Sequence, residues 1–384
     1  MEYWEEINHK FKPWIDTDLS ATVVDLFAGC GGLSLGFEAN GFKTIGYEMD
    51  EHASNTYNTN LLGECITGKL TPDSTYPNAD VVIGGPPCQP FSVGGKQLGL
   101  KDSRDGFPIY ISAVRQLDPK VFLFENVRGM LYKNKWYLRE VIVELKGLGY
   151  HIDFALLNAV NYEVPQNRER VIVMGSKQKI KLPRPIRRTV TAGEALGRLA
   201  FEFDQDSRFF TASMDRYVAN YEMASKCVNP RDLHLDRPAR TLTCRNLAGA
   251  TGDMHRVKLA DGRRRRITVR EAARLQSFPD WFEFQGTETQ QYNQIGNAVA
   301  PNFAFHLAKN IKSHLTGAIP VISASNQPAP QQSRIPSQVA RQVGENCPPA
   351  HGGGDGCVLQ PPASRFRPSS RNNASMDWDG RAGL

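Results

Sequence analysis

The stretch TVVDLFAGCGGLSLGFEA, residues 22–39, decides the fold class because its pattern changes from that of a strand to that of a helix across a glycine turn. Residues 22–27 form the apolar, β-branched run that is typical of a buried parallel strand, and residues 33–39 continue as a helix. The glycines between them allow a ligand to approach the backbone closely, and the helix N-terminus offers it free N–H groups. The stretch therefore predicts an α/β fold with a ligand site at this turn.

An acidic residue follows at the spacing that nucleotide-binding folds use. Residues 45–48 have the pattern of a second strand that ends in Glu48, about twenty residues after the turn. A carboxylate there can accept hydrogen bonds from both hydroxyls of a ribose. This pair of features favours a nucleoside or dinucleotide site, although glycine in a tight strand-to-helix turn often has only a steric function.

A cysteine lies on a stiff loop after another short apolar run. Residues 80–83 (DVVI) are typical of a buried strand, and GGPPCQPFS at residues 84–92 places Cys88 at its carboxyl end, where ligands bind in open α/β sheets. The prolines fix φ and the glycines permit close approach, so the thiol is a candidate nucleophile. A small buried hydrophobe is the usual alternative for a lone cysteine. The hydrophilic residues 94–106 that follow predict a mobile loop beside the site, or an ordinary solvated connector.

Polar residues also follow the next predicted strands. Residues 121–124 (VFLF) precede Glu125, and residues 165–170 (PQNRER) precede the strand at 171–174. Arg168 and Arg170 are two residues apart at the start of a strand, so we expect both to project to the same face. Such a pair can hold a phosphate or a carboxylate, and a surface ion pair with Glu169 is the alternative.

Composition narrows the function classes. The chain has 384 residues, 40% of them hydrophobic, and no apolar run long enough to span a bilayer. Its seven cysteines lie far apart without a C-x-x-C pair, which argues against a zinc site or a disulfide framework. The acidic, aromatic N-terminus lacks a secretory pattern, so we expect a cytosolic protein. From the cysteine spacing we expect no bound metal. A net charge of +6 permits a polyanionic partner but does not require one.

Six motifs occur in one order along the chain: DLFAGCGG at 25–32, GPPCQPFS at 85–92, ENV at 125–127, QNRER at 166–170, RITVREAARLQSFP at 266–279 and QIGNAVAP at 294–301. The series resembles the DNA (cytosine-5) methyltransferase family of bacteria and phages, and the resemblance covers about residues 21–315. It implies a Rossmann-like S-adenosylmethionine-dependent methyltransferase domain with a mostly parallel sheet, together with a small irregular target-recognition domain. The implied bounds are 1–178 and 263–317 for the catalytic domain and 179–262 for target recognition.

The same resemblance assigns catalytic roles that suit the chemistry. Cytosine C5 is too weak a nucleophile to take a methyl group unaided, so a thiolate first adds at C6. The family match makes Cys88 this nucleophile and Glu125 the acid at N3 of the ring. It also implies that Arg170 holds the base carbonyl and positions Glu125, and that Arg168 supports the flipped nucleotide.

For the methyl donor, S-adenosylmethionine, the match implies contacts from Phe27, Gly29, Gly31, Glu48, Met49, Pro86 and Asn297. Within this set, Glu48 would bind the ribose, Met49 the adenine face and Asn297 the methionine end. One departure is visible. The family often has an acid after the third strand for the adenine amino group, whereas Lys69 aligns there, and we assign no replacement.

For DNA, the resemblance implies contacts from Gln89, Ser92, Thr241, Arg240 and Arg245. Gln89 and Ser92 match positions near the space that the flipped base vacates, and Thr241 belongs to the family's Thr-Leu element. Residues 226–236 and 244–256 are the expected reading loops. The Asp261-Gly262 pair predicts a hairpin turn, and the four arginines at 263–266 are expected either to contact phosphates or to be solvated.

The rest of the chain is less specific. Thr268 and Glu271 predict a capping box at the start of a helix, and a last helix is expected after Pro301. Residues 318–384 are rich in Pro, Ser, Gln, Asn and Gly, which predicts a disordered tail. We therefore expect a monomer that acts on double-stranded DNA in the cytoplasm, at the nucleoid of a bacterial or phage-infected cell, with no membrane contact. The expected setting is either a restriction-modification system with a separate restriction endonuclease as partner or an orphan methylase.

Three alternatives stand beside this reading. Transfer RNA methyltransferases share the Pro-Pro-Cys-Gln loop, but the Cys-Phe-Thr signature usual in that class does not occur before the last motifs. A DNA-binding regulator could use the fold without turnover, although every residue that the chemistry needs is present. A nicotinamide oxidoreductase would explain the fold but neither Cys88 nor the late motifs.

Overall fold

The computed structural model describes residues 1–317 except 20, 88–104, 206, 225–230 and 250–252. Cys88, Gln89 and Ser92 therefore lie outside the described residues, as do most of the expected mobile loop and the whole of the expected disordered tail.

The largest sheet of the described residues has seven strands, in the order β3-β2-β1-β4-β5-β7-β6. Neighbouring strands are parallel except at β7, which runs antiparallel to both β5 and β6. This confirms the mostly parallel sheet. The strands are β1 Thr22–Leu26, β2 Lys43–Glu48, β3 Glu64–Thr67, β4 Val81–Gly84, β5 Val121–Val127, β6 His151–Asn158 and β7 Glu169–Ser176.

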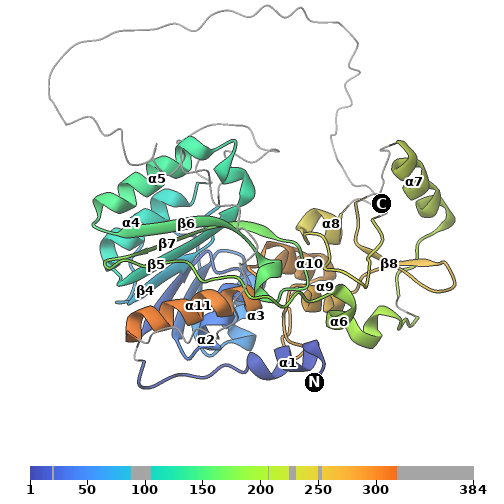
Figure 1. The fold of residues 1–384 in the computed structure, drawn as a ribbon, viewed down its shortest axis with the longest axis horizontal. Coiled ribbons are helices and arrows are strands. Elements are labelled where there is room, and N and C mark those ends of the chain that lie inside the picture. Colours follow the sequence, from blue (N-terminus) through green and yellow to red (C-terminus); the bar gives the residue numbers. More distant parts are fainter. Residues whose placement is uncertain (20, 88–104, 206, 225–230, 250–252, 318–384) are drawn as a thin grey trace, which may run out of the picture. The chain divides into compact units, whose positions relative to one another are not determined.

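Helices cover both faces of this sheet (Figure 1). Because side chains alternate along a strand, Val23 of β1 joins the apolar cluster under α2 and α11, whereas Val24 joins the cluster under α4 and α5. The close fit of α2 to α11 depends on Gly36, where a Cβ atom would lie 2.5 Å from Ala304 Cβ. The helices named here are α2 Gly32–Glu38, α4 Phe107–Leu117, α5 Lys135–Gly147 and α11 Pro301–Thr316.

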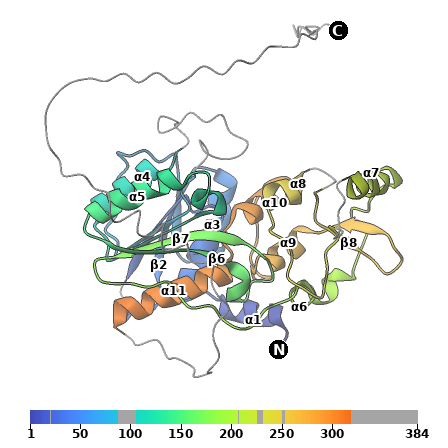
Figure 2. The same cartoon turned by 45° about the horizontal axis from the view of Figure 1, so that its top comes forward.

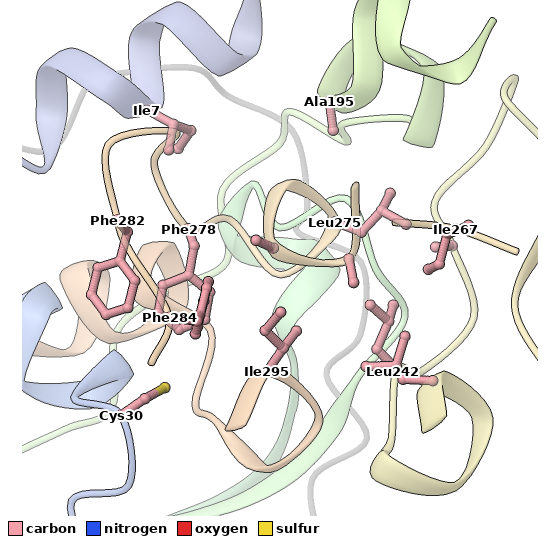
Figure 3. Close-up of a cluster of buried hydrophobic side chains, with 14 of the residues drawn as sticks. Ile7, Cys30, Ala195, Leu242, Ile267, Leu275, Phe278, Phe282, Phe284 and Ile295 are labelled. Carbon is pink, nitrogen blue, oxygen red and sulfur yellow. The ribbon is translucent and has the colours of Figure 1, made fainter. Parts of the chain in front are cut away.

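A third apolar cluster joins the first helix to residues between 242 and 295 (Figure 3). It contains Ile7, Leu242, Leu275, Phe278 and Ile295. Thr268 caps α9 through the predicted capping box with Glu271, which confirms that prediction. The remaining elements are α1 Tyr3–Lys10, α3 Glu51–Asn60, α6 Ala192–Leu196, α7 Ala212–Ala224, α8 Cys244–Ala248, α9 Val269–Leu275, α10 Glu288–Asn297, β8 Arg256–Lys258, β9 Arg264–Arg266 and the 3-10 turns Arg128–Leu131, Ala159–Tyr162 and Gly197–Ala200.

The Asp261-Gly262 turn joins β8 to β9 in an antiparallel hairpin, as predicted, with Gly262 at φ 87°. The hairpin spans the expected domain boundary at residue 263 and lies beside α7 in the views of Figures 1 and 2.

The arginine run in this hairpin has a structural use. Arg265 is buried and forms a bidentate pair with Glu271 at 2.7 Å, and Arg264 bonds Asp232 and Asp215 at 3.0 Å. The expectation that the run contacts phosphate or is solvated is therefore wrong for these two residues, since acids inside the fold hold their guanidinium groups. Arg263 is half exposed, pairs with Asp261 at 2.7 Å and lies over the rings of Phe203 and Phe209.

Candidate active site

The carboxyl ends of four neighbouring parallel strands meet at one edge of the sheet. Leu26 at the end of β1 pairs with Tyr47 of β2 and with Gly84 of β4, and Gly84 pairs with Phe124 of β5. The residues that directly follow these four paired positions are Phe27, Glu48, Gly85 and Glu125. Sequence positions up to about a hundred residues apart thus converge where open α/β sheets bind ligands.

The glycine turn after β1 is built around the carboxylate of Glu48. Gly29 N–H donates to Glu48 Oε2 at 2.9 Å, and the N–H groups of Met49 and Asp50 donate to Oε1 at 2.8 and 2.9 Å. Gly31 has φ 87°, and a Cβ atom there would lie 2.7 Å from the ring of Tyr57, so no other residue fits without strain. Three backbone donors therefore fix the Glu48 carboxylate beside the turn.

The surroundings of Glu48 fit a nucleoside cofactor. A Cβ atom at Gly29 would meet nothing within 4 Å, so the space above the turn is open. Met49 is 68% exposed and offers an apolar surface next to the carboxylate. Glu48 Oε2 accepts one hydrogen bond and keeps a lone pair for a ribose hydroxyl, and Phe27, directly after β1, has φ 61° at the start of the turn. These residues could hold S-adenosylmethionine.

Two backbone contacts anchor the described ends of the Cys88 loop. Asn126 Nδ2 donates to the carbonyl of Pro86 at 2.9 Å, and Gly106 N–H donates to the carbonyl of Pro87 at 3.0 Å. A Cβ atom at Gly106 would lie 2.4 Å from Pro87 Cδ, which requires glycine. Buried Asp105 accepts from the Tyr137 hydroxyl and from Phe107 N–H. Sequence reasoning gave no role to Asn126 or Asp105, although Asn126 lies inside the ENV motif.

Glu125 and Arg170 form a close ion pair at the same edge. Glu125 Oε1 lies 2.6 Å from Arg170 Nε, and each side chain is 12% exposed. A Cβ atom at Gly85 would lie 4.0 Å from Glu125 Oε2, so the second carboxylate oxygen lies near the strand end that leads to Cys88. An acid and an arginine are thus fixed next to the loop that carries the candidate nucleophile.

Comparison with known proteins agrees with this geometry. A family model described as C-5 cytosine-specific DNA methylase matches residues 21–313. The chain belongs to this family. The Type II methyltransferase M.AplI of Arthrospira platensis is 51% identical over 339 residues, which is 88% of this chain and 98% of that relative. The Type II methyltransferase M.PspPI of a Psychrobacter species is 34% identical and covers 79% of this chain and 82% of its own length.

Solved structures show the same fold. A prophage-encoded E. coli protein described as a DNA modification methyltransferase has a TM-score of 0.58 at 25% identity, over 77% of this chain and 100% of that one. The DNMT2 protein of Spodoptera frugiperda has a TM-score of 0.59 at 20% identity, over 76% of this chain and 99% of its own, which shows the fold alone. The chain is a DNA (cytosine-5) methyltransferase that uses S-adenosylmethionine, and the regulator and oxidoreductase alternatives are set aside.

The two arginines of the methyltransferase's QNRER motif have different surroundings. Arg170 faces Glu125, whereas Arg168 is 2% exposed and donates to the carbonyls of Leu242, Gly296 and Ala298 at 2.8 to 3.1 Å. Burial, with a smaller effect of Arg170, lowers the pKa of Arg168 to about 9. The alternative partner, Glu169, pairs instead with Arg128 at 2.7 Å. A direct contact of Arg168 with a nucleotide stays a prediction, since backbone carbonyls hold its guanidinium group in this structure.

Asn297 contacts Cys244, which lies three residues after Thr241. Asn297 is exposed at the end of α10, and its Oδ1 accepts from the Cys244 thiol at 2.9 Å. Thr241 Oγ1 donates to the carbonyl of Asn167 at 2.6 Å. The methyltransferase therefore brings a predicted cofactor residue close to the predicted DNA-contacting segment.

Parts of the expected reading loops, residues 226–230 and 250–252, lie outside the described residues, and a helix occupies part of the rest. Residues 244–248 form α8, with Arg245 exposed on it. Arg240 donates from Nη1 to Asp253 Oδ1 at 3.0 Å and from Nη2 to the Asp253 carbonyl. Arg256 is fully buried between Glu222 and Asp232. The prediction that it belongs to a base-reading loop is therefore wrong, because its ion pairs connect β8 to α7 and to Asp232.

Two further findings apply to the part of the chain that the structure describes. It contains no group of three or more His, Cys, Asp or Glu side chains that could hold a metal ion. Within the same residues, every helix is too short or too polar to cross a membrane.

Proposed function

We propose that the methyltransferase flips a cytosine out of a specific double-stranded DNA sequence and methylates C5 after Cys88 has added to C6. The observation that supports this most is the Glu125–Arg170 pair of 2.6 Å, with Glu125 Oε2 near Gly85 on the way to Cys88. A flipped base in this place would meet an acid for its N3 edge and a guanidinium group for its carbonyl oxygen.

The proposed chemistry assigns one task to each residue. The Cys88 thiolate forms a bond to C6 while Glu125 shares a proton with N3, which moves electron density to C5. S-adenosylmethionine supplies the methyl group that C5 takes. The C5 proton then leaves to a base, and the electrons that it releases break the bond between C6 and the Cys88 sulfur. Arg170 holds the base carbonyl and keeps Glu125 in place through its Nε.

The described cysteines are poor alternatives to Cys88. Burial raises the pKa of Cys30 and of Cys65 to about 12, so neither is a thiolate near neutral pH. The Cys244 thiol donates to Asn297 Oδ1, and burial raises its pKa as well. Cys88 is in the motif that the family uses and remains the proposed nucleophile.

The cofactor and DNA contacts are proposed from position. Phe27, Gly29, Gly31, Glu48 and Met49 would line the nucleoside part of the cofactor site, with Pro86 and Asn297 toward the reacting group. For DNA, the proposed contacts are Gln89, Ser92, Thr241, Arg240 and Arg245, and Arg240 would first have to leave Asp253.

The biological setting is proposed from the relatives, which are named Type II methyltransferases. We propose that the enzyme acts as a monomer on cellular DNA in the cytoplasm, and that a separate restriction endonuclease recognises the same sequence.

Bisulfite sequencing of DNA from cells that express the protein tests the proposal. We expect one cytosine within one short sequence to resist conversion at nearly every occurrence, and cells that express Glu125→Gln to lose this protection. Protection of transfer RNA with none in DNA would contradict the DNA substrate.

A further inference from the structure

A buried polar cluster lies behind the site, where the target-recognition segment meets the end of α10. Arg168 donates from Nη1 to the Leu242 carbonyl at 2.8 Å and from Nη2 to the carbonyls of Gly296 and Ala298 at 3.1 and 2.9 Å. These acceptors lie 74, 128 and 130 residues further along the chain. One side chain therefore connects three segments that the sequence keeps far apart.

Two buried glutamines extend the cluster. Gln166 Oε1 accepts from Leu242 N–H at 2.8 Å, and its Nε2 donates to Gln276 Oε1. Gln276 Nε2 in turn donates to the carbonyls of Ile295 and Ala298 at 2.9 and 3.1 Å. Both backbone groups of Leu242 are thus held by the QNRER motif, and the same cluster holds the last turn of α10.

The two held segments also touch directly. A Cβ atom at Gly296 would lie 2.4 Å from Cys244 N and 2.7 Å from Thr243 C, so the backbones meet with no side chain between them. The Cys244 thiol donates to Asn297 Oδ1 at 2.9 Å, and Figure 3 shows Leu242 and Ile295 in one apolar cluster. Closely packed interiors transmit displacements, so a shift of residues 243–244 must also displace Gly296, and the reverse.

Each held segment carries a residue proposed to bind a different ligand. Thr241, proposed to contact DNA, directly precedes the Leu242 carbonyl that Arg168 holds. Asn297, proposed for the cofactor, lies between the two other carbonyls that Arg168 holds. The polar cluster therefore lies between the two binding sites, with a direct backbone path to each.

We propose that Arg168 is a positioning residue that couples DNA binding to cofactor binding by locking residues 241–244 to residues 296–298. The proposal rests on the proposed function, since it takes Thr241 and Asn297 as ligand contacts. DNA held at Thr241 fixes the Leu242 carbonyl, Arg168 then fixes the last turn of α10, and Asn297 is held ready for the cofactor. By linkage, the cofactor tightens DNA binding by the same factor.

The test measures the dissociation constant of S-adenosylhomocysteine, by calorimetry, with and without a saturating duplex that contains the sequence found by bisulfite sequencing. In the wild type we expect the duplex to tighten cofactor binding by a factor in the range of about 5 to 150. In Arg168→Met this factor should fall to about one, whereas the affinity without DNA should change by less than about threefold. Arg168→Lys, which keeps the charge and can reach one or two carbonyls, should recover part of it.

Arg128→Met is the matched control, because the Arg128 side chain is 59% exposed and its contacts, an ion pair with Glu169 and a position over the Tyr132 ring, lie on the surface. It should keep the wild-type factor. If circular dichroism shows Arg168→Met to be unfolded, Cys244→Ala decides instead: it removes the thiol contacts to Asn297 Oδ1 and to the Asn293 carbonyl, both on α10, and should lower the factor at least threefold.

A wild-type factor of one, or a wild-type factor retained in Arg168→Met, would overturn the proposal. Weaker duplex binding by Arg168→Met with an unchanged factor would show a direct nucleotide contact instead, and would also overturn it. Failure of the proposed function is separate, because no protected sequence would then appear in the bisulfite experiment.

Discussion

Arg170 Nε lies 2.6 Å from Glu125 Oε1, and the two residues come from neighbouring antiparallel strands, β7 and β5. In the sheet, Arg170 is paired with Val127, two residues beyond Glu125. Its guanidinium group therefore extends along the strand towards Glu125 and fixes one carboxylate oxygen. The other oxygen lies toward Gly85. The pair therefore holds the Glu125 carboxylate in one orientation beside the strand end that leads to Cys88.

Glu125→Gln keeps the shape of this side chain and removes its ability to exchange a proton. We expect kcat to fall by roughly a hundredfold or more, which is typical of a positioned acid or base, with little change in DNA affinity. Single-turnover methylation with labelled cofactor measures the first effect and gel shift the second.

Arg128→Gln is the control for this prediction, because it breaks the exposed pair between Arg128, directly after β5, and Glu169 of β7 at 2.7 Å and leaves Arg170 in place. It should methylate at close to the wild-type rate. Equal losses in both variants would mean that the Glu125 effect is not specific.

Buried Asp25 should make the free energy of unfolding depend on pH. Burial, opposed by the Ser34 hydroxyl and assisted by Glu48, raises the pKa of Asp25 to about 7. An unfolded aspartate has a pKa of about 3.9, so between these values the unfolded chain has released a proton that the folded chain retains. The contribution of Asp25 is fully present below about pH 4 and is lost as pH rises through about 7.

Asp25→Asn removes this titration. The free energy of unfolding of the variant minus that of the wild type should therefore increase from pH 4.5 to pH 7.5, by up to about 4 kcal/mol. Urea unfolding at the two pH values measures the free energies of unfolding. The difference between variant and wild type cancels the contributions of other titrating groups, such as His255, whose pKa burial lowers to about 3. A difference that is the same at both pH values would exclude a raised pKa for Asp25.

The sequence predicted those elements that depend on local pattern. The strand, turn and helix at residues 22–39, the Asp261-Gly262 hairpin and the Thr268 cap were found because adjacent residues determine them. The sequence also predicted that Arg170 lies beside Glu125, because the resemblance carried by the motif series assigns both residues to the target base.

The partners of long side chains could not be predicted in this way. Arg256 meets Glu222 and Asp232, and Arg168 meets three backbone carbonyls, and nothing in the local sequence distinguishes these arginines from solvated ones. Which acid or carbonyl a guanidinium group meets depends on how distant segments pack, which only the fold determines.

Arg265 provides a test of the structural use of the arginine run. Arg265→Met leaves Glu271 buried without its partner, and removal of one member of a buried pair costs about 3–5 kcal/mol. Arg263→Met, two positions away but half exposed, should cost no more than about 1 kcal/mol. Thermal unfolding compares the two, and a similar small loss in both would show that the Arg265 pair does not stabilise the hairpin.

If residues 226–236 and 244–256 read the bases, the DNA sequence specificity should be transferable with them. Exchange of residues 226–230 and 245–252 for those of a relative, with Asp232, Asp253 and Arg256 retained for their ion pairs, should change the methylated sequence. Cofactor affinity without DNA should stay unchanged, because Glu48 and its backbone donors are not altered. Bisulfite sequencing gives the outcome, and an unchanged methylated sequence would place base reading elsewhere.

The central claim is that Cys88 adds to C6 of the target cytosine, and covalent trapping tests it most directly. Fluorine at C5 cannot leave as a proton does, so a duplex with 5-fluorocytosine at the target should hold the enzyme after the methyl group has transferred. The measurement is mass spectrometry of the denatured adduct formed with S-adenosylmethionine. We predict a methylated 5-fluorocytosine joined to Cys88, and no adduct from Cys88→Ser. An adduct on Cys30, Cys65 or Cys244, or no adduct on a duplex that the enzyme methylates when it contains cytosine, would contradict the claim.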